Sequence, residues 1–342
     1  MRISLIGLII LIGSVLWVNY PGDRVEVEKV NGVSLVSSRE PESAQYIRDV
    51  LRINANWVAI VPYAFSYKDD PKVVHSHARQ WWGERPEGVK VMINEAKAHG
   101  LKVMLKPHVW VRGDGWPGDF RLKNKEEWDQ WGKDYSDYLL EYAKLADSLD
   151  VEMICIGTEF RNSVRDVPEF WIQLIKQIRS VYTGKLTYAA NWDNYQHVPF
   201  WEELDFIGVD AYFPLDTTLN PSVERIVDGW QLSYDELRKF SKQMDRPVLF
   251  TEYGYQSSDY TVSRPWESAR QKEPNMEAQC DAYVALYQVF WKQDWFAGGF
   301  LWKWHLRSDY GGIDNSRYTP QQKPVESVIR EAYRINSSSA EH

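Results

Sequence analysis

The regular alternation of apolar runs with longer amphipathic segments is the feature of this sequence that most constrains its fold. Eight short apolar runs read as strands: residues 32–36, 57–62, 101–106, 152–157, 185–190, 206–210, 248–251 and 299–302. The segments between them carry apolar residues at steps of three and four, the period of a helix packed on a core. These predicted helices are residues 42–53, 88–99, 126–149, 168–182, 223–244, 275–292 and 324–334. The gap between the fifth and sixth runs leaves room only for a turn at residues 200–204.

Strand and helix alternating over roughly 300 residues is typical of a closed parallel (β/α)8 barrel, the TIM barrel of the α/β class. Nearly continuous apolar strands fit a parallel sheet that is covered on its outer face. An open doubly wound sheet is the alternative, and the eight comparable units favour the barrel. Because no Ser, Gly or Pro-rich linker interrupts the series, we expect a single domain at residues 23–336 and a disordered tail at 337–342.

The N-terminal segment predicts export. Residues 3–18 follow Arg2 and are apolar apart from small residues, and a polar turn comes after them. The stretch is long for the core of a signal peptide and short for a full membrane span of about 20 residues. We therefore expect residues 1–22 to be a signal peptide or a membrane anchor. The protein would then be secreted, periplasmic or tethered to the membrane through residues 3–18.

The composition narrows the class of ligand. With 48 acidic and 40 basic residues, the net charge of -8 and the lack of a dense Lys or Arg block argue against nucleic acid as a partner. The 17 Trp and 20 Tyr exceed what a core needs, and many stand beside Gly, Pro or Asp, as expected for rings that stack on sugars from loops. The His-x-His at residues 75–77 lies in a loop rather than at the end of the first strand, where a zinc hydrolase would need it. We expect no metal and no cofactor.

The carboxyl ends of the predicted strands carry the candidate site. In (β/α)8 barrels the chemistry lies at these ends and in the loops that follow them. The fourth and seventh strands, although apolar, end in Glu159 and Glu252. Strands three apart on an eight-membered ring face each other, so this pair should meet across the barrel mouth. The other strand ends supply polar and aromatic side chains: Lys106, His108, Trp110, Asn191, Trp192, Asp210, Tyr212 and Trp302.

Two carboxyl groups that face each other in an aromatic pocket are what hydrolysis of a glycosidic bond requires. One must hold a proton for the leaving oxygen, and the other must be ionised to attack the anomeric carbon or to activate water. A separation of about 5–5.5 Å gives retention of configuration, and roughly 6.5–9.5 Å gives inversion. Each glutamate alone could instead be a structural residue that pairs with Lys or Arg or caps a helix. The two together, with the aromatic residues, favour catalysis.

Several motifs in sequence order resemble one known family. They are LKPHVW (105–110), GTE (157–159), TYAANWD (187–193), DFIGVDAYFP (205–214) and FTEYGY (250–255), together with WWGERPEGV (81–89). They resemble the retaining β-mannanases of glycoside hydrolase family 113, in the large clan of (β/α)8 glycosidases, over residues 31–333. The resemblance implies Glu159 as acid/base and Glu252 as nucleophile. It also implies that Tyr212 hydrogen-bonds the nucleophile and that Trp302 forms the floor under the reacting sugar.

Two positions depart from the clan pattern. Most members have Asn immediately before the acid/base, where this chain has Thr158, and many have His two residues before the tyrosine, where it has Asp210. The usual contact to the sugar 2-hydroxyl must then be made differently, and Asn191 is the candidate.

Among the remaining candidates, Trp110, Trp116 and Trp192 lie in predicted rim loops, where they could stack on sugars. His108 could hydrogen-bond a sugar hydroxyl or the nucleophile, or be a structural histidine.

These features predict a retaining glycoside hydrolase that cleaves a β-1,4-linked, mannose-containing polysaccharide or its oligosaccharides by double displacement. A related β-glycanase acting on glucan or glucomannan is the nearest enzymatic alternative, since aromatic rings fix where sugars stack better than which epimer is accepted. A non-catalytic carbohydrate-binding barrel would use the same aromatic residues. The two opposed glutamates argue against that class.

Overall fold

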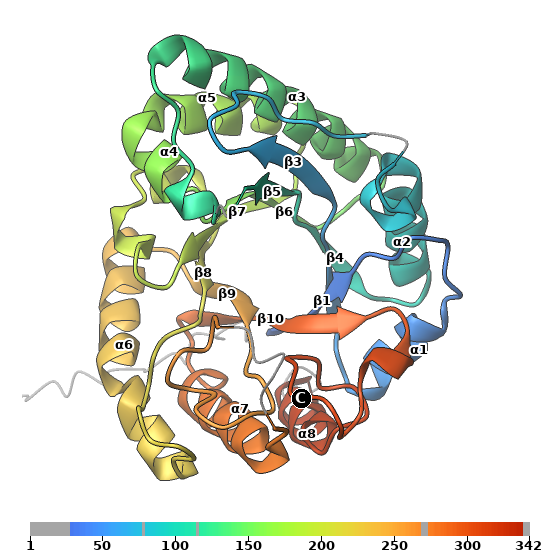
Figure 1. The fold of residues 1–342 in the computed structure, drawn as a ribbon, viewed down its shortest axis with the longest axis vertical. Coiled ribbons are helices and arrows are strands. Elements are labelled where there is room, and N and C mark those ends of the chain that lie inside the picture. The colour runs from blue at the N-terminus through green and yellow to red at the C-terminus, as the bar shows by residue number, and fades with distance from the viewer. Residues whose placement is uncertain (1–27, 77–78, 114–115, 268–272, 338–342) are drawn as a thin grey trace, which may run out of the picture.

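Eight parallel strands close into a barrel in the computed structural model, which describes residues 28–76, 79–113, 116–267 and 273–337. Around the barrel the order is β1-β10-β9-β8-β7-β6-β4-β2 (Figure 1). The strands are β1 (Val30–Val36), β2 (Trp57–Ile60), β4 (Lys102–Leu105), β6 (Met153–Thr158), β7 (Lys185–Asn191), β8 (Ile207–Asp210), β9 (Val248–Tyr253) and β10 (Phe296–His305). Each overlaps one of the predicted strands, and the predicted (β/α)8 fold is confirmed.

Helices surround the barrel on its outer side (Figure 1). They are α1 (Gln45–Arg52), α2 (Pro86–Ala98), α3 (Lys125–Ser148), α4 (Arg161–Asp166), α5 (Pro168–Arg179), α6 (Val223–Met244), α7 (Met276–Phe290) and α8 (Val325–Ser337). All the predicted helices are found, whereas the short α4 was not predicted. Between β7 and β8, the 3-10 turns Tyr195–His197 and Trp201–Glu203 take the place of a helix. This reduction agrees with the short gap in the sequence.

The strands bury both of their faces, which explains their nearly continuous apolar character. Inward side chains such as Met104, Cys155 and Phe300 form a cluster inside the barrel. Outward side chains pack with the helices in a second, larger cluster. Gly32 leaves room for the ring of Phe300, because a Cβ at that position would lie 2.3 Å from it. The thiol of Cys155 is buried, that of Cys280 is half-buried, and both are free.

A separate two-stranded parallel sheet extends the barrel beyond β2 and β4. Its strands are β3 (Tyr63–Tyr67) and β5 (His108–Arg112), paired from Tyr63 opposite His108 to Tyr67 opposite Arg112. The sequence interpretation placed these residues in loops. Each strand buries alternate residues, and their other residues are half-buried or exposed.

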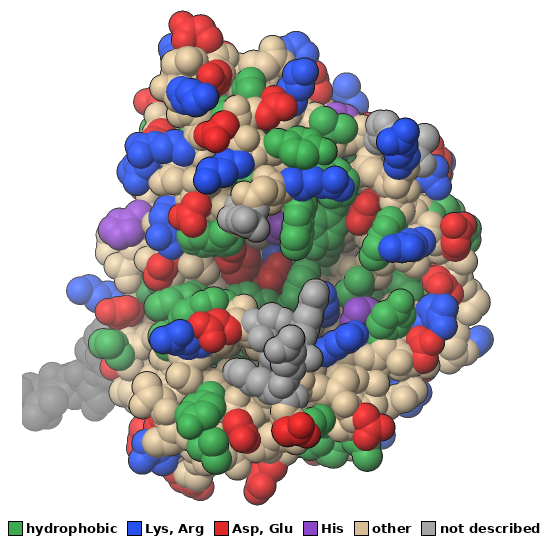
Figure 2. Space-filling model, viewed as in Figure 1, with side chains coloured by type: hydrophobic (Ala, Val, Ile, Leu, Met, Phe, Trp, Pro, Cys, Tyr) green, Lys and Arg blue, Asp and Glu red, His purple; other side chains and the backbone are tan. Residues whose placement is uncertain are grey.

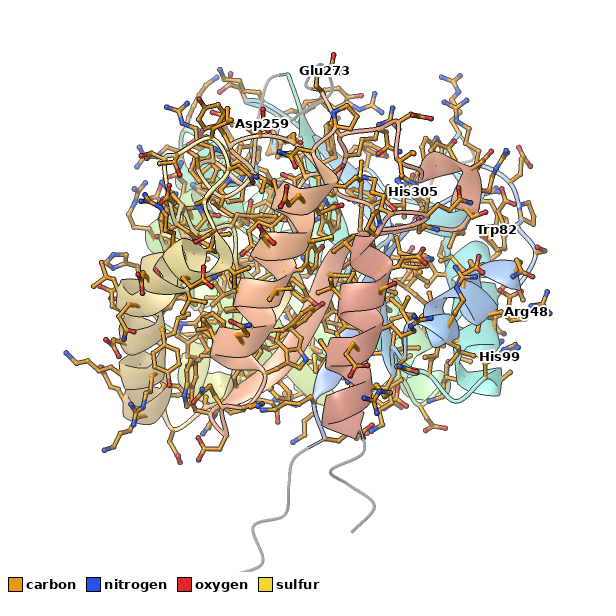
Figure 3. All side chains as sticks on the ribbon, turned by 90° about the horizontal axis from the view of Figure 1, so that it is seen from below. Arg48, Trp82, His99, Asp259, Glu273 and His305 are labelled. Carbon is orange, nitrogen blue, oxygen red and sulfur yellow. The ribbon has the colours of Figure 1, made fainter. Side chains whose placement is uncertain are left out.

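The two ends of the barrel differ in what they carry. In the side view of Figure 3, His305 at the end of β10 lies toward the same end as Asp259, whereas His99, which precedes β4, lies toward the other. The loops that follow the strands therefore gather at the end that carries His305 and Asp259. No helix among the described residues is long and apolar enough to cross a membrane. Ser337, the first residue of the predicted tail at 337–342, is instead the last residue of α8. Residues 1–22 and 338–342 lie outside the described residues, so the export signal and the disorder of the rest of the tail stay predictions.

Candidate active site

A pocket of about 690 Å³ lies at the carboxyl ends of the barrel strands. This volume is within the range of small-ligand sites, roughly 300–1,000 Å³. In Figure 2 acidic side chains lie at the bottom of the central hollow, with hydrophobic side chains around them. Nine of the ten side chains selected from the sequence line the pocket: Glu159, Glu252, His108, Trp110, Asn191, Trp192, Asp210, Tyr212 and Trp302. The tenth, Lys106, lies buried beneath it and contacts two of the nine.

Glu252 is held by a hydrogen bond on each carboxylate oxygen. It lies in β9 and is only 8% exposed. The ammonium of Lys106 donates to Oε1 at 2.5 Å, and the hydroxyl of Tyr212 donates to Oε2 at 2.8 Å. Charge-assisted hydrogen bonds are shorter and stronger than neutral ones. The two contacts therefore fix the orientation of this carboxyl group at the pocket wall.

Lys106 also contacts a second carboxyl group, that of Asp210. Its ammonium lies 3.5 Å from Oδ1 of Asp210, which also accepts the hydroxyl of Thr251 at 2.7 Å. Burial lowers the pKa of Lys106, but the charges of Asp210 and Glu252 outweigh burial and leave this pKa raised. Burial and then the charge of Glu252 raise the pKa of Asp210 well above its usual range. One cation thus faces two carboxyl groups, and its ammonium lies closer to Glu252 than to Asp210.

Glu159 has a different environment from Glu252. It directly follows β6 and has a φ of 56°, a left-handed conformation that is uncommon outside glycine and is found at functional sites. The indole N–H of Trp116 donates to its Oε2. Burial raises the pKa of Glu159 to about 7, against the lowering effect of the Trp116 hydrogen bond and with a further rise from the charge of Glu252. Two glutamates with different hydrogen-bond partners thus share one pocket.

The sequence matches the family model of Glycoside Hydrolase Family 113 over residues 36–323, most of the chain. The protein belongs to glycoside hydrolase family 113. The family 113 β-mannanase from Alicyclobacillus acidocaldarius, solved in complex with ManMIm, is similar, with a TM-score of 0.81 and 25% sequence identity. That match covers 91% of this chain and 99% of the other.

Further solved structures share the fold of this glycoside hydrolase. A family 113 β-1,4-mannanase solved as a complex has a TM-score of 0.78 and 24% identity, covering 90% of this chain and 99% of its own. A β-glucuronidase from Faecalibacterium prausnitzii has a TM-score of 0.60 at 14% identity, covering 90% of this chain and 49% of its own. The sequence matches none of the curated proteins with which it was compared.

Aromatic side chains surround the two glutamates of this glycoside hydrolase. Trp302, a half-buried residue of β10, lines the pocket, and its peptide bond to Lys303 is cis. Trp192 stacks on Trp266 with ring centroids 5.5 Å apart. Trp110, on β5, is 57% exposed. These rings offer flat apolar surfaces on several sides of the pocket.

Three of the candidate side chains contact other residues of the pocket. The ring of His108 packs on Tyr63, and its Nδ1 has no hydrogen-bond partner among the described residues. Burial and the charge of Lys106 lower the pKa of His108 to about 3, so the ring is neutral and can bind a sugar hydroxyl. The side-chain amide of Asn191 donates to Asp193 at 2.8 Å. Trp116, which could stack on a sugar, lines the pocket and hydrogen-bonds Glu159.

The pocket residues that were not selected from the sequence include Tyr63, Arg161, Trp266 and Tyr318. The alternating pattern of residues 63–67 could have revealed Tyr63. Arg161 packs its guanidinium 4.7 Å from the ring of Trp116 and pairs with Asp193 at 2.8 Å. Trp266 and Tyr318 lie in long loops whose sequences carry no period.

Within the described residues, no group of three or more His, Cys, Asp or Glu side chains is placed to hold a metal ion. His75 packs against Tyr138 and lies 3.3 Å from Glu141. His77, the other member of the His-x-His sequence, lies outside the described residues.

Proposed function

We propose that this glycoside hydrolase cleaves β-1,4-linked, mannose-containing polysaccharides or oligosaccharides with retention of anomeric configuration. The proposal rests on the two glutamates that line one pocket. Glu159 has a raised pKa, and Glu252 accepts a hydrogen bond from Lys106. Groups whose environments favour opposite protonation states are suited to acid and nucleophile roles. The similarity to the β-mannanase from A. acidocaldarius supports the substrate class.

In the first step, the carboxylate of Glu252 attacks the anomeric carbon and forms a glycosyl ester. The bond to the leaving oxygen breaks, and Glu159 gives that oxygen its proton. The hydrogen bond from Tyr212 and the ion pair with Lys106 keep the attacking carboxylate in place. A protonated Glu159 and an ionised Glu252 are the starting states that this step needs.

In the second step, Glu159 is ionised and takes a proton from water. The water oxygen attacks the anomeric carbon, the ester bond breaks, and Glu252 returns to its carboxylate form. Two displacements at one carbon restore the original configuration. Lys106 neutralises the charge that returns to Glu252, and so it favours departure of the sugar.

The remaining pocket residues are proposed to bind the sugar chain. Trp302 forms the floor for the reacting sugar, and Trp192 and Trp110 provide stacking surfaces for its neighbours. Oδ2 of Asp210 has no hydrogen-bond partner among the described residues, and as a protonated acid it can donate to a sugar hydroxyl. Asp210 thus takes a position where many clan members have histidine.

The pH dependence of the enzyme should report the protonation of Glu159. Its pKa is raised to about 7, so the carboxyl holds its proton below about pH 7 and loses it above. Because protonation of the leaving oxygen needs that proton, kcat/KM should fall with rising pH, by about tenfold per pH unit well above 7. Steady-state rates on mannohexaose between pH 5 and about 9 would check this. A kcat/KM that stays level to pH 9 would assign the proton to another group.

The substrate class is tested with two oligosaccharides that differ in epimer. Mannohexaose should be cleaved with a kcat/KM at least about tenfold above that for cellohexaose, because contacts to the axial 2-hydroxyl distinguish them. Products are followed by chromatography. Equal or faster cleavage of cellohexaose would make the enzyme a glucanase, and no cleavage of either would overturn the proposed substrate.

A further inference from the structure

A second pocket adjoins the catalytic pocket. It has a volume of about 610 Å³, and Tyr63 and Trp110 line both pockets. The two pockets are therefore neighbouring parts of one cleft. In Figure 2 hydrophobic side chains gather over β3 and β5, beside the central hollow.

The wall of the second pocket is one face of the β3–β5 sheet. On β3, Tyr63, Phe65 and Tyr67 lie on this face, whereas the intervening residues are buried. On β5, Trp110 and Arg112 lie on it, and the guanidinium of Arg112 packs 4.5 Å from the ring of Phe65. Side chains two apart on a strand share a face. The buried face of the sheet is sufficient to pack it on the core. The aromatic residues on the open face are therefore not needed for folding.

The opposite side of the pocket comes from the segment before α2. Trp81 is 39% exposed there, and the guanidinium of Arg39 covers its ring at 5.3 Å. Glu84, which also lines the pocket, is buried. Burial raises the pKa of Glu84 to about 7, against a hydrogen bond from the backbone of Trp81. A carboxyl that is partly protonated at neutral pH can both donate and accept hydrogen bonds.

This combination of flat rings with a few buried or charged polar groups matches a sugar better than an apolar ligand. Exposed apolar clusters of this kind mark binding sites. A sugar ring has one apolar face for an aromatic ring and hydroxyl groups for a carboxyl group. A purely apolar ligand would cover the carboxyl group of Glu84 without forming a hydrogen bond to it. Burying the carboxyl group in this way costs free energy.

We propose that the second pocket binds further sugar units of the same mannan chain, at a distance from the bond that is cleaved. The inference rests on the proposed function and deepens it, because it assigns the enzyme to chains longer than the catalytic pocket holds. Trp81 and Trp110 stack on the sugar rings, and Glu84 hydrogen-bonds their hydroxyl groups. Tyr63 and Trp110 join the two pockets, so a mannan chain that is bound in the catalytic pocket is the ligand that can extend into the second pocket.

The test measures binding by calorimetry in a Glu252→Gln background, so that the chain is not cleaved. Adding Trp81→Ala should weaken the binding of mannohexaose relative to mannobiose by about tenfold, equivalent to about 1.4 kcal/mol. Trp81→Phe keeps a ring and should retain most of the affinity. Glu84→Gln, which preserves side-chain shape, should shift the ratio in the same direction as Trp81→Ala.

Leu232→Ala is the matched control, since Leu232 is 71% exposed on α6 and lines neither pocket. A thermal melt of each variant separates a binding effect from a folding effect. An unchanged ratio in folded Trp81→Ala and Glu84→Gln proteins would overturn the second pocket as a sugar site while leaving the proposed function intact. If the background protein bound no mannohexaose, both the substrate class and this inference would fail.

Discussion

Glu252→Gln is expected to lower kcat/KM for mannohexaose by at least about 10⁴-fold. The amide keeps the shape of the side chain and can still accept from Tyr212, but it cannot attack the anomeric carbon. Lys106, which is fully buried, would also lose the nearer of its two carboxyl partners. Initial rates measured over a range of mannohexaose concentrations would give the effect.

Glu273→Gln is the matched control for this change. Glu273 is exposed and lines neither pocket, so the same change of charge should leave the rate within about twofold of the wild type. A Glu252→Gln protein that is folded and keeps more than about one tenth of the activity would exclude Glu252 as the nucleophile.

Glu159→Ala should have an effect that depends on the leaving group. For mannohexaose, loss of the general acid is expected to lower kcat/KM by about 10²–10⁴-fold. For 2,4-dinitrophenyl β-mannoside, whose leaving group needs no proton, formation of the glycosyl ester should be much less affected. The second step would then limit turnover, because no base activates water. Pre-steady-state release of dinitrophenolate would show a burst.

Azide distinguishes an acid/base role of Glu159 from a structural role. It needs no general base, so it should restore turnover of the aryl mannoside by Glu159→Ala and give the β-mannosyl azide. The decline in wild-type activity above about pH 7 should also disappear with that substrate. Equal losses on both substrates, without a response to azide, would rule out Glu159 as the acid/base.

The barrel could be predicted because its strands carry a strong local signal. Strands buried on both faces are apolar throughout, and the long helices around them repeat every three to four residues. β3 and β5 escaped prediction because each directly follows a barrel strand and has one face open to the cleft. α4 is only 6 residues long, too short for a period to show.

The two facing glutamates could be placed from the sequence because barrel topology fixes where strand ends lie. The electrostatic partners of the pair depend on contacts between distant segments. Lys106 and Glu252 are separated by 146 positions, and their ion pair follows only from the closed barrel. The hydrogen bond from Trp116 to Glu159 likewise depends on the course of a loop. Local pattern predicts neither contact.

The most direct test of the account is to trap the glycosyl ester with a 2-deoxy-2-fluoro-β-mannosyl fluoride and locate it by mass spectrometry. Fluorine at C2 slows both steps, and the fluoride leaving group lets the first proceed. The account predicts one fluoromannosyl group per protein, on the peptide that contains Glu252, and none on the Glu252→Gln variant. Labelling of a different carboxyl group in the wild-type enzyme would contradict the assignment of Glu252 as nucleophile.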